Sequence, residues 1–404
     1  MEEERSPFDY KQFEAEALKA LQGGKPLEGK DGVLAPLIKR LLEAGLNGEM
    51  EAHLAGSRGK NRRNGRNSKQ VKTAFGKLEI ETPRDRESTF EPQLLPKRQT
   101  VLGEALDHKV ISLYGRGMSY SDICQHLEEL YGLTVSPSSL SIITDRIIED
   151  VKAWQNRPLE SVYPFVWMDA IHYKVKEDGA IKTKAVYCLI GVNREGVKDL
   201  LGLYISENEG ARFWLNILTD IQNRGVHDII IACIDNLKGF SEAIEAVFPN
   251  TEVQLCVVHQ IRNTTRHVAI KDSRELLKDL KMVYDSPTKE RAQTELNAFD
   301  EKWGHKYPTI IKSWNNNWER LTCYFRYPKE IRKMIYTTNM IESFHSQLRK
   351  VTKSKRVFSS DMALLKLLFL VQGNLKHGWT GPIGGWKQTF AQMNIIFPER
   401  MMQH

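Results

Sequence analysis

Three carboxylates stand where catalytic or metal-binding side chains are often found. Asp169 directly follows the apolar run Val166–Met168, and Asp235 follows the run IIIACI. Each could be an ordinary cap or turn residue. A buried strand nevertheless seldom ends in a carboxylate without a reason, because an unpaired buried charge is costly. If the two strands are neighbours, both aspartates lie on one face of a sheet, and a carboxylate from a following helix would complete a set of three.

Glu342 is the candidate for the third carboxylate. It is the only acid between residues 331 and 360, a stretch with seven Lys and Arg residues. A helix-terminal charge or a solvated salt bridge would explain a lone glutamate. A metal ligand beside a bound phosphate would explain both the acid and its basic surroundings. Oxygen ligands suit Mg²⁺, and two such ions about 3.5–4 Å apart can serve the attacking and leaving oxygens of phosphodiester transfer.

Two basic clusters indicate a polyanionic partner. Residues 57–77 carry eight Lys and Arg, residues 349–356 carry five, and neither cluster contains an acid. A solvated face is the alternative interpretation of either cluster alone, but two separate clusters favour a nucleic acid. The residues expected to contact DNA are Arg58, Lys60, Arg62, Arg63 and Arg66 in the first cluster and Arg349, Lys350, Lys353, Lys355 and Arg356 in the second.

The hydrophobic pattern predicts the elements that must position these side chains. Leu, Ile and Ala recur at three- and four-residue spacing through residues 9–55, which predicts amphipathic helices that pack. Residues 59–67, rich in Gly, Asn and Arg, are too polar to bury and are expected to form a flexible loop. Residues 71–83 alternate around a Gly turn and predict a small hairpin. Three prolines make residues 83–98 extended.

A helix-turn-helix shape is expected within residues 117–147. Ser119 can cap a first helix that Gly132 ends, and Ser136 can cap a second. Helical hairpins are common, so the pattern gains weight only from the basic residues that precede it. In such a motif the start of the second helix meets base edges, which points to Ser138 and Ser139.

From Pro158 onwards the pattern is that of an α/β unit. Strands are expected at residues 162–170, 184–193 and 197–205, followed by a helix at 210–223, a strand at 227–235, a helix at 237–248 and a strand at 251–258. This order predicts a mixed sheet. Residues 260–335 have helical patterns that are rich in charge and Trp, without strand signals.

Cys256 and His259 form half of a zinc site on paper, but no second pair lies at suitable spacing. The strand end and the helix start at these residues instead place His259 near Asp235. There it would act beside the reacting phosphate or support the floor of the site, and a packed structural histidine is the alternative. Trp314 and Trp318 share a helical face, for which core packing is expected and a DNA-facing stack is the alternative.

The block from Asp235 to His259 resembles the signature of Mutator-type insertion-sequence transposases. In that signature an Asp is followed by Gly and an apolar residue, then by Pro, and finally by Cys-x-x-His. The matching positions are Asp235, Gly239, Phe240, Val247, Phe248, Pro249, Thr251, Gln254, Cys256 and His259. The phrases VKTAFGKLEIETPRDR, FEPQLLPKRQ, YTTNMIES and QLRKVTKSK are also similar to family text, so the resemblance covers about residues 35–395.

The resemblance implies an α/β RNase H-like catalytic domain with an all-helical insertion, preceded by mainly helical N-terminal DNA-binding domains. It implies a DDE triad of Asp169, Asp235 and Glu342 that holds two Mg²⁺ (or Mn²⁺) ions per active site. Arg349 fits the basic residue that the family has seven positions after the Glu. Asn236 stands where many relatives have Gly, a difference that we expect to be tolerated with an altered loop beside the metal.

The expected domains follow from the patterns and the resemblance together. They are an N-terminal helical region (1–56), a basic loop with a DNA-contacting hairpin (57–101), a helix-turn-helix-like domain (102–155), a catalytic domain in two parts (158–261 and 336–395) and an all-helical insertion (262–335).

Composition narrows the class of protein. Five scattered cysteines are typical of a reducing cytosol rather than of a disulfide framework. No apolar run approaches the ~20 residues of a membrane span, and the start MEEERSPFDY lacks the pattern of a secretory signal. These features predict a cytoplasmic protein without a membrane span, and the resemblance further implies a bacterial protein that associates with the nucleoid.

The expected function is transposition. The chain should bind the terminal inverted repeats of its own insertion sequence, cut DNA to expose a 3′-hydroxyl and join that hydroxyl to target DNA, at least as a homodimer. The resemblance further implies a copy-out, paste-in route, which the residues themselves do not show. One alternative is a structure-selective nuclease of the same fold that does not join DNA. A DNA-binding regulator is the other, and an intact triad argues against it.

Overall fold

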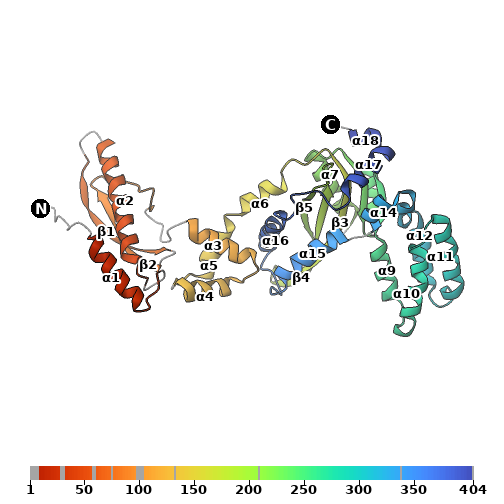
Figure 1. Ribbon diagram of the computed structural model, residues 1–404, viewed down its shortest axis with the longest axis horizontal. Coiled ribbons are helices and arrows are strands. Elements are labelled where there is room, and N and C mark those ends of the chain that lie inside the picture. Colours follow the sequence, from red (N-terminus) through yellow and green to blue (C-terminus); the bar gives the residue numbers. More distant parts are fainter. Residues whose placement is uncertain are drawn as a thin grey trace. The chain divides into compact units, whose positions relative to one another are not determined.

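The computed structural model (Figure 1) describes residues 9–27, 32–56, 61–73, 76–96, 104–131, 133–207, 210–336 and 339–402. Internal contacts divide the chain into two compact units, Met1–Arg146 and Ile147–His404. Each unit is described by itself. The finer division into six parts that the sequence suggests stays a prediction.

The first unit contains a hairpin covered by a helix. Helices α1 (Tyr10–Gln22) and α2 (Ala35–Gly56) precede strands β1 (Arg63–Thr73) and β2 (Gly76–Asp85), which pair antiparallel. Side chains of α2, both strands and the following loop form one core cluster of Leu46, Val71, Leu78, Ile80 and Leu95. The alternation of apolar residues around the hairpin turn therefore predicts its inner face correctly.

Two expectations for this unit are wrong in part. The polar residues from Arg63 to Asn67 were expected in a loop but belong to β1. An antiparallel strand is held by backbone hydrogen bonds to its partner, so polar side chains do not prevent it, and the register shifts between Arg63 and Arg66. Helix α1 was expected to pack, yet it buries none of its residues, and Leu18 is 53% exposed.

Three short helices complete the first unit: α3 (Glu104–Gly115), α4 (Tyr120–Tyr131) and α5 (Pro137–Asp145). The expected caps are confirmed. Ser119 Oγ accepts a hydrogen bond from the backbone of Asp122 at 3.1 Å, and Ser136 Oγ accepts one from the backbone of Ser139 at 3.2 Å. Each cap satisfies an N–H group that the first helical turn leaves unpaired. The two helices and their N-caps are therefore present as expected. That they bind DNA stays a prediction.

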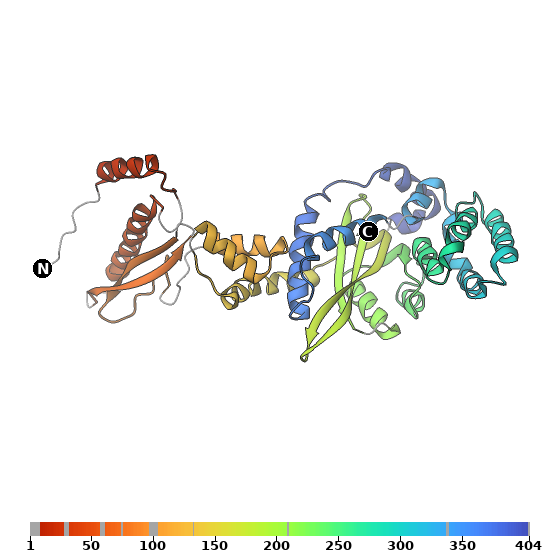
Figure 2. The ribbon, with the colours of Figure 1, turned by 90° about the horizontal axis from the view of Figure 1, so that it is seen from below.

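The second unit is built around a mixed five-stranded sheet (Figure 2). Its order is β5-β4-β3-β6-β7. Strands β3 (Val162–Glu177), β4 (Ala180–Val192) and β5 (Lys198–Ser206) pair antiparallel, whereas β6 (Asp228–Ile234) and β7 (Glu252–Leu255) add in parallel beside β3. Helix α7 (Ala211–Asn223) connects β5 to β6, and α8 (Phe240–Val247) connects β6 to β7. The number and order of the expected strands are confirmed, but the last strand is shorter than expected, because residues 257 and 258 belong to the helix that follows.

Helix α6 (Ile148–Gln155) belongs to the second unit. The ring of Trp154 lies 5.7 Å from that of Phe369 on helix α16 (Asp361–Lys376), and Gln155 Nε2 donates to the Leu203 carbonyl of β5 at 3.0 Å. The sequence grouped these residues with 102–155, because helical periodicity alone does not show which core a helix joins.

Between β7 and residue 336 the described chain is helical, as expected. The elements are α9 (Val257–Arg266), α10 (Ile270–Tyr284), α11 (Lys289–Trp303), α12 (Pro308–Asn316), α13 (Trp318–Leu321), η1 (Cys323–Arg326) and α14 (Lys329–Tyr336). Trp314 and Trp318 are 2% and 8% exposed. Trp314 Nε1 also donates to Thr264 Oγ1 at 3.0 Å. Core packing of both rings is confirmed.

The chain then returns to the sheet through α15 (Asn339–Thr352), α16, α17 (Trp386–Ile396) and α18 (Pro398–Met402). Helix α15 lies along β3 in both views (Figures 1 and 2). Phe358, which follows α15, exchanges backbone hydrogen bonds of 2.8 Å with Lys174 and Lys176 of β3. These bonds fix the end of α15 against the sheet. No helix in the described ranges is long and apolar enough to cross a membrane.

Candidate active site

Asp169 and Asp235 are brought together by the parallel ladder of β3 and β6. The last pair in this ladder is Met168 with Ile234, so the next residue on each strand is an aspartate. The sequence suggested that both end their strands, and for Asp169 this is wrong. Strand β3 continues to Glu177 because β4 still pairs with it. The expected juxtaposition holds nevertheless, since only the β6 side of the ladder ends there.

Two helices supply the remaining walls of the site. Glu342, His345 and Arg349 follow one another at three- and four-residue spacing on α15, so they share a helical face. His259 and Arg262 are three residues apart on α9. Together these elements enclose a cavity of about 290 Å³ lined by Asp169, Ala170, His259, Arg262, Glu342, His345 and Arg349.

His259 lies beside Asp235, as the sequence suggested, and also beside Asp169, which it did not. Its Nδ1 forms an ion pair with Asp235 Oδ1, and its Nε2 lies 4.0 Å from Asp169 Oδ2. Cys256 explains the position, because its Sγ accepts a hydrogen bond from the backbone of His259 at 3.3 Å and so caps α9. The ligand atoms of Asp235, Cys256 and His259 lie within 4.8 Å of one another. The half zinc site therefore has a third donor that sequence spacing did not indicate.

Arg262 and His345 are site residues that the sequence analysis missed. Arg262 Nη2 pairs with Glu342 Oε1 at 2.6 Å, and His345 Nδ1 lies 3.5 Å from Asp169 Oδ2. Helical spacing could have indicated them, because Arg262 lies one turn after His259 and His345 lies one turn after Glu342. It could be used only once the two helices were known to face the same strand ends.

The surroundings of the site shift the pKa values of its ionisable side chains in different directions. Burial and the nearby charge of Asp235 raise the pKa of Asp169 above its ordinary value. Burial works against a charged His259, but its contacts with Asp235 and Cys256 outweigh burial and raise its pKa. Burial, together with the charges of Arg349 and His259, lowers the pKa of His345 to about 3. At neutral pH His345 is therefore neutral and His259 is cationic.

The carboxylates fit a hard divalent cation. The buried oxygens Asp235 Oδ1 and Glu342 Oε1 are paired with the cationic side chains of His259 and Arg262, so the site gathers positive charge against its carboxylates. A divalent ion could replace these cations, since carboxylate oxygens are donors that Mg²⁺ and Mn²⁺ prefer.

The second basic cluster lies on and after α15. Arg349 lines the cavity, and Arg349, Lys350, Lys353 and Arg356 are exposed. Within the described part of the chain none of these four pairs with a carboxylate. Lys355 is half-buried, with its Nζ 6.0 Å from the centre of the Phe358 ring. Four unpaired exposed cations beside a carboxylate site suit a phosphate backbone.

Two arginines of the first basic cluster form ion pairs with acids elsewhere in the first unit. Arg58 and Lys60 lie outside the described residues. Arg62 is exposed, but Arg63 pairs with Glu51 of α2 at 2.9 Å and Arg66 with Glu81 of β2 at 3.3 Å. Residues 57–77 contain no acid, but Glu51 and Glu81, which lie outside this stretch, neutralise part of its charge.

The helix start expected to meet base edges has a local hydrogen-bond network. The hydroxyls of Ser138 and Ser139 lie 2.8 Å and 2.9 Å from that of Ser136. Ser138 is exposed and Ser139 half-buried. A role of either residue in reading DNA stays a prediction.

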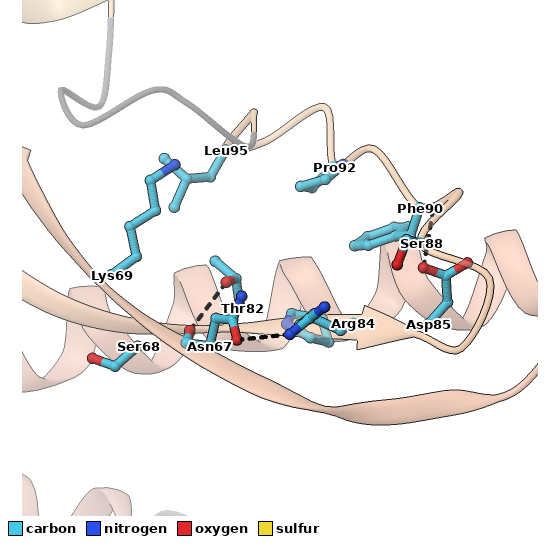
Figure 3. Close-up of a pocket in the computed structure, with 11 residues that line it drawn as sticks. Asn67, Ser68, Lys69, Thr82, Arg84, Asp85, Ser88, Phe90, Pro92 and Leu95 are labelled. Atoms are coloured by element: carbon cyan, nitrogen blue, oxygen red, sulfur yellow. Dashed lines mark hydrogen bonds between the residues drawn. The ribbon is translucent and has the colours of Figure 1, made fainter.

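A separate cavity of about 510 Å³ lies in the first unit beside the hairpin. Figure 3 shows Asn67, Thr82 and Arg84 on the strands facing Pro92 and Leu95 on the loop that follows β2. Asp85 holds this loop by accepting hydrogen bonds from both the backbone and the side chain of Thr89. The cavity contains no cluster of carboxylates, and the sequence analysis did not anticipate it.

Comparison with known proteins agrees with the sequence motifs. The model of the Mutator family of transposases matches residues 10–381. The chain is 44% identical over 396 residues to the transposase for insertion sequence element ISRM3 of Rhizobium meliloti, which covers 96% of this chain and 99% of that protein. A probable transposase for an ISRM3-like element of Sinorhizobium fredii is 43% identical over 396 residues, again covering 96% and 99%. The chain therefore belongs to the Mutator family of transposases, enzymes that act on DNA.

A solved structure, the Drosophila P element transposase strand transfer complex, aligns with 74% of this chain and 93% of its own at 11% identity. Its TM-score of 0.28 is too low to support a statement about the fold.

Proposed function

We propose that this chain binds the terminal inverted repeats of its own insertion sequence, cleaves DNA to expose a 3′-hydroxyl and transfers that strand to target DNA. The observation that carries the proposal is the cavity that gathers Asp169 and Glu342 with Arg262 and Arg349, directly beside Asp235. Phosphodiester transfer needs this combination, because anionic ligands hold a metal while cations hold the substrate's phosphates.

Asp169, Asp235 and Glu342 would hold two Mg²⁺ or Mn²⁺ ions. Two observations support this assignment: Asp169 and Asp235 follow the last pair of the β3–β6 ladder, and Glu342 lines the same cavity as Asp169. When bound, such ions stabilise the attacking and leaving oxygens of an in-line displacement. His259 orients Asp235 through its ion pair and presents a positive charge to the phosphate that is cut. Arg349 stands at the cavity wall, where it binds a phosphate oxygen.

The topology of the second unit supports an RNase H-like catalytic domain. In such domains three antiparallel strands are followed by two parallel ones on the other side of the first strand, which is the order β5-β4-β3-β6-β7. The end of α9 and helices α10 to α14 then correspond to the all-helical insertion expected at residues 262–335, between the second aspartate and the glutamate. Strand ends that meet at a change of direction are common locations for sites in α/β sheets.

Recognition of the repeats is assigned to the first unit. Helices α4 and α5 have the caps and lengths of a helix-turn-helix, with Ser138 and Ser139 exposed or half-buried at the start of α5. The basic hairpin, including Arg62, would contact the phosphate backbone. Two ends must be held for joining, so the active form is at least a homodimer.

Labelled terminal-repeat DNA incubated with the protein and Mg²⁺ tests the proposal. We expect joined products from the wild-type chain. Cut products without joining would favour a nuclease of the same fold, and retarded DNA without cleavage would favour a DNA-binding regulator.

The Glu342→Gln variant sharpens this test. It removes one charge from the carboxylate set and leaves the basic surface unchanged, so DNA binding should persist while cutting and joining fall below detection. Glu330→Gln, an exposed acid on α14, is the matched control and should retain activity. Cleavage by Glu342→Gln at the wild-type rate would remove Glu342 from the active site.

A further inference from the structure

Helix α9 places a cation against two of the three site carboxylates. His259 pairs with Asp235, and one turn further on Arg262 pairs with Glu342 at 2.6 Å. The helix is fixed at its start by the Cys256 cap, so both side chains are aimed at the site by one rigid element. In the DNA-free chain, α9 therefore supplies the positive charge that the proposed function assigns to metal ions.

Arg262 differs from His259 in how firmly it is held. Its side chain is 54% exposed and that of Glu342 is 31% exposed, whereas His259 is 21% exposed. Exposed ion pairs contribute little free energy, because water screens them and two flexible side chains must be ordered. A divalent cation at Glu342 could thus displace Arg262, whose side chain is more than half exposed.

We infer that Arg262 is a placeholder cation that couples metal binding to DNA binding, an inference that rests on the proposed function. Without metal, its guanidinium occupies Glu342. With Glu342 engaged by a divalent ion, Arg262 would be free to bind a phosphate of the DNA in the cavity, since a guanidinium matches phosphate oxygens in two-point geometry. Arg262 is a positioning residue that takes no part in proton transfer.

Metal binding to the DNA-free protein is the first test. The Arg262→Ala variant should bind Mn²⁺ about two- to fivefold more tightly than wild type, because the ion no longer displaces a guanidinium from an exposed pair. Arg266→Ala is the matched control. Arg266 is exposed on the same helix, donates to Asn263 at 3.3 Å and does not line the cavity, so its loss should leave the affinity unchanged.

An unchanged or weakened Mn²⁺ affinity in Arg262→Ala would overturn the inference and leave the proposed function standing. If wild type and all variants fail to bind Mn²⁺, the proposed metal site itself is wrong, and the inference falls with it.

DNA binding in EDTA is the second test and involves no metal. In the wild-type background Arg262 is held by Glu342, so Arg262→Ala should change the affinity for terminal DNA less than about twofold. In the Glu342→Gln background Arg262 is free, and its removal should weaken binding about tenfold. The log–log salt slope of Glu342→Gln should be steeper by about 0.9 than that of the double variant, which corresponds to one phosphate contact.

Equal losses in both backgrounds would mean that Arg262 contacts DNA independently of Glu342. No loss in either background would mean that it contacts none. Both results contradict the coupling.

Discussion

At the residue scale, part of the family signature is structural rather than catalytic. Gln254 on β7 is 1% exposed. Its Nε2 donates to the Leu321 carbonyl at 2.9 Å, and its Oε1 accepts from the backbone of Tyr324 at 2.8 Å. One amide thus satisfies two backbone groups of the helical segment that follows the sheet. These hydrogen bonds hold α13 and η1 against β7, the strand that leads into α9.

Replacing Gln254 by Leu should destabilise the second unit without touching the carboxylates. The Leu321 carbonyl and the Tyr324 N–H would lose their hydrogen bonds to this amide, which costs about 2–3 kcal/mol in total. Thermal unfolding of the purified variant measures the loss. Gln388→Leu, on an exposed position of α17, is the control and should unfold within about 0.5 kcal/mol of wild type. Equal stability of the two variants would mean that Gln254 has no structural role.

The sequence indicated the three carboxylates because of their local context, two after apolar runs and one in a basic stretch. It did not indicate Arg262 or His345. Their partners, Glu342 and Asp169, are distant in sequence and are reached only when α9 and α15 converge on the end of the β3–β6 ladder. Residue type predicts which groups can do chemistry, whereas the approach of separate elements decides which of them meet.

At the element scale, strands with strong apolar runs were predictable and strands held mainly by backbone pairing were not. The buried runs of β3, β4 and β6 stand out in the sequence. The polar start of β1 does not stand out, because it is held by backbone hydrogen bonds to β2, which leave no pattern in the side chains. The bonds of Phe358 with β3 are hidden for the same reason.

The turn between β4 and β5 depends on a glycine. Gly196 has φ +82°, and a Cβ there would lie 2.3 Å from the Trp386 ring of α17. Gly196→Ala should therefore destabilise the chain by about 2–3 kcal/mol through strain and displacement of the ring. Gly384→Ala is the control, because a Cβ at that position meets no atom within 4 Å. Chemical denaturation of the pair gives the difference, and similar midpoints would contradict this account of the turn.

The loop after β2 depends on the charge of Asp85, which is 2% exposed. Burial alone would raise the pKa of Asp85, but hydrogen bonds from Asn61, Thr89 and the backbone of Phe90 outweigh burial and hold it well below its usual range. Because the pKa is depressed in the folded state, this stabilisation is fully present above the unfolded pKa of about 3.9. It is lost as pH falls from there toward the folded pKa.

Asp85→Asn should accordingly cost about 1–2 kcal/mol at pH 7, and its difference from wild type should shrink between pH 4 and pH 2.5. Urea unfolding at both ends of this window measures the difference. Glu87→Gln is the control, an exposed acid in the same loop that should change stability little at any pH. A difference for Asp85→Asn that stays constant down to pH 2.5 would show that the charge is not responsible.

At the scale of the whole molecule, the sequence pattern and the contacts of the structure place the boundary between the two parts of the chain at different residues. The sequence ends its third domain at residue 155, whereas the contacts divide the chain after Arg146. Helix α6 and the residues after it contact the sheet and α16. Besides the Trp154 and Gln155 contacts, Arg157 pairs with Asp199 of the second unit at 2.7 Å. Residues 147–157 should thus be part of the second unit's fold.

Two fragments distinguish these boundaries. Fragment 147–404 should fold by itself and unfold at the temperature of the corresponding transition in the full chain, because it retains α6. Fragment 158–404 loses Trp154, Gln155 and Arg157, and exposes the ring of Phe369 and the carboxylate of Asp199 that they cover. Its unfolding temperature should be lower by roughly 5–10 °C, as a loss of a few kcal/mol implies for a chain of this length. Equal unfolding temperatures for the two fragments would instead group α6 with residues 102–146, as the sequence analysis did.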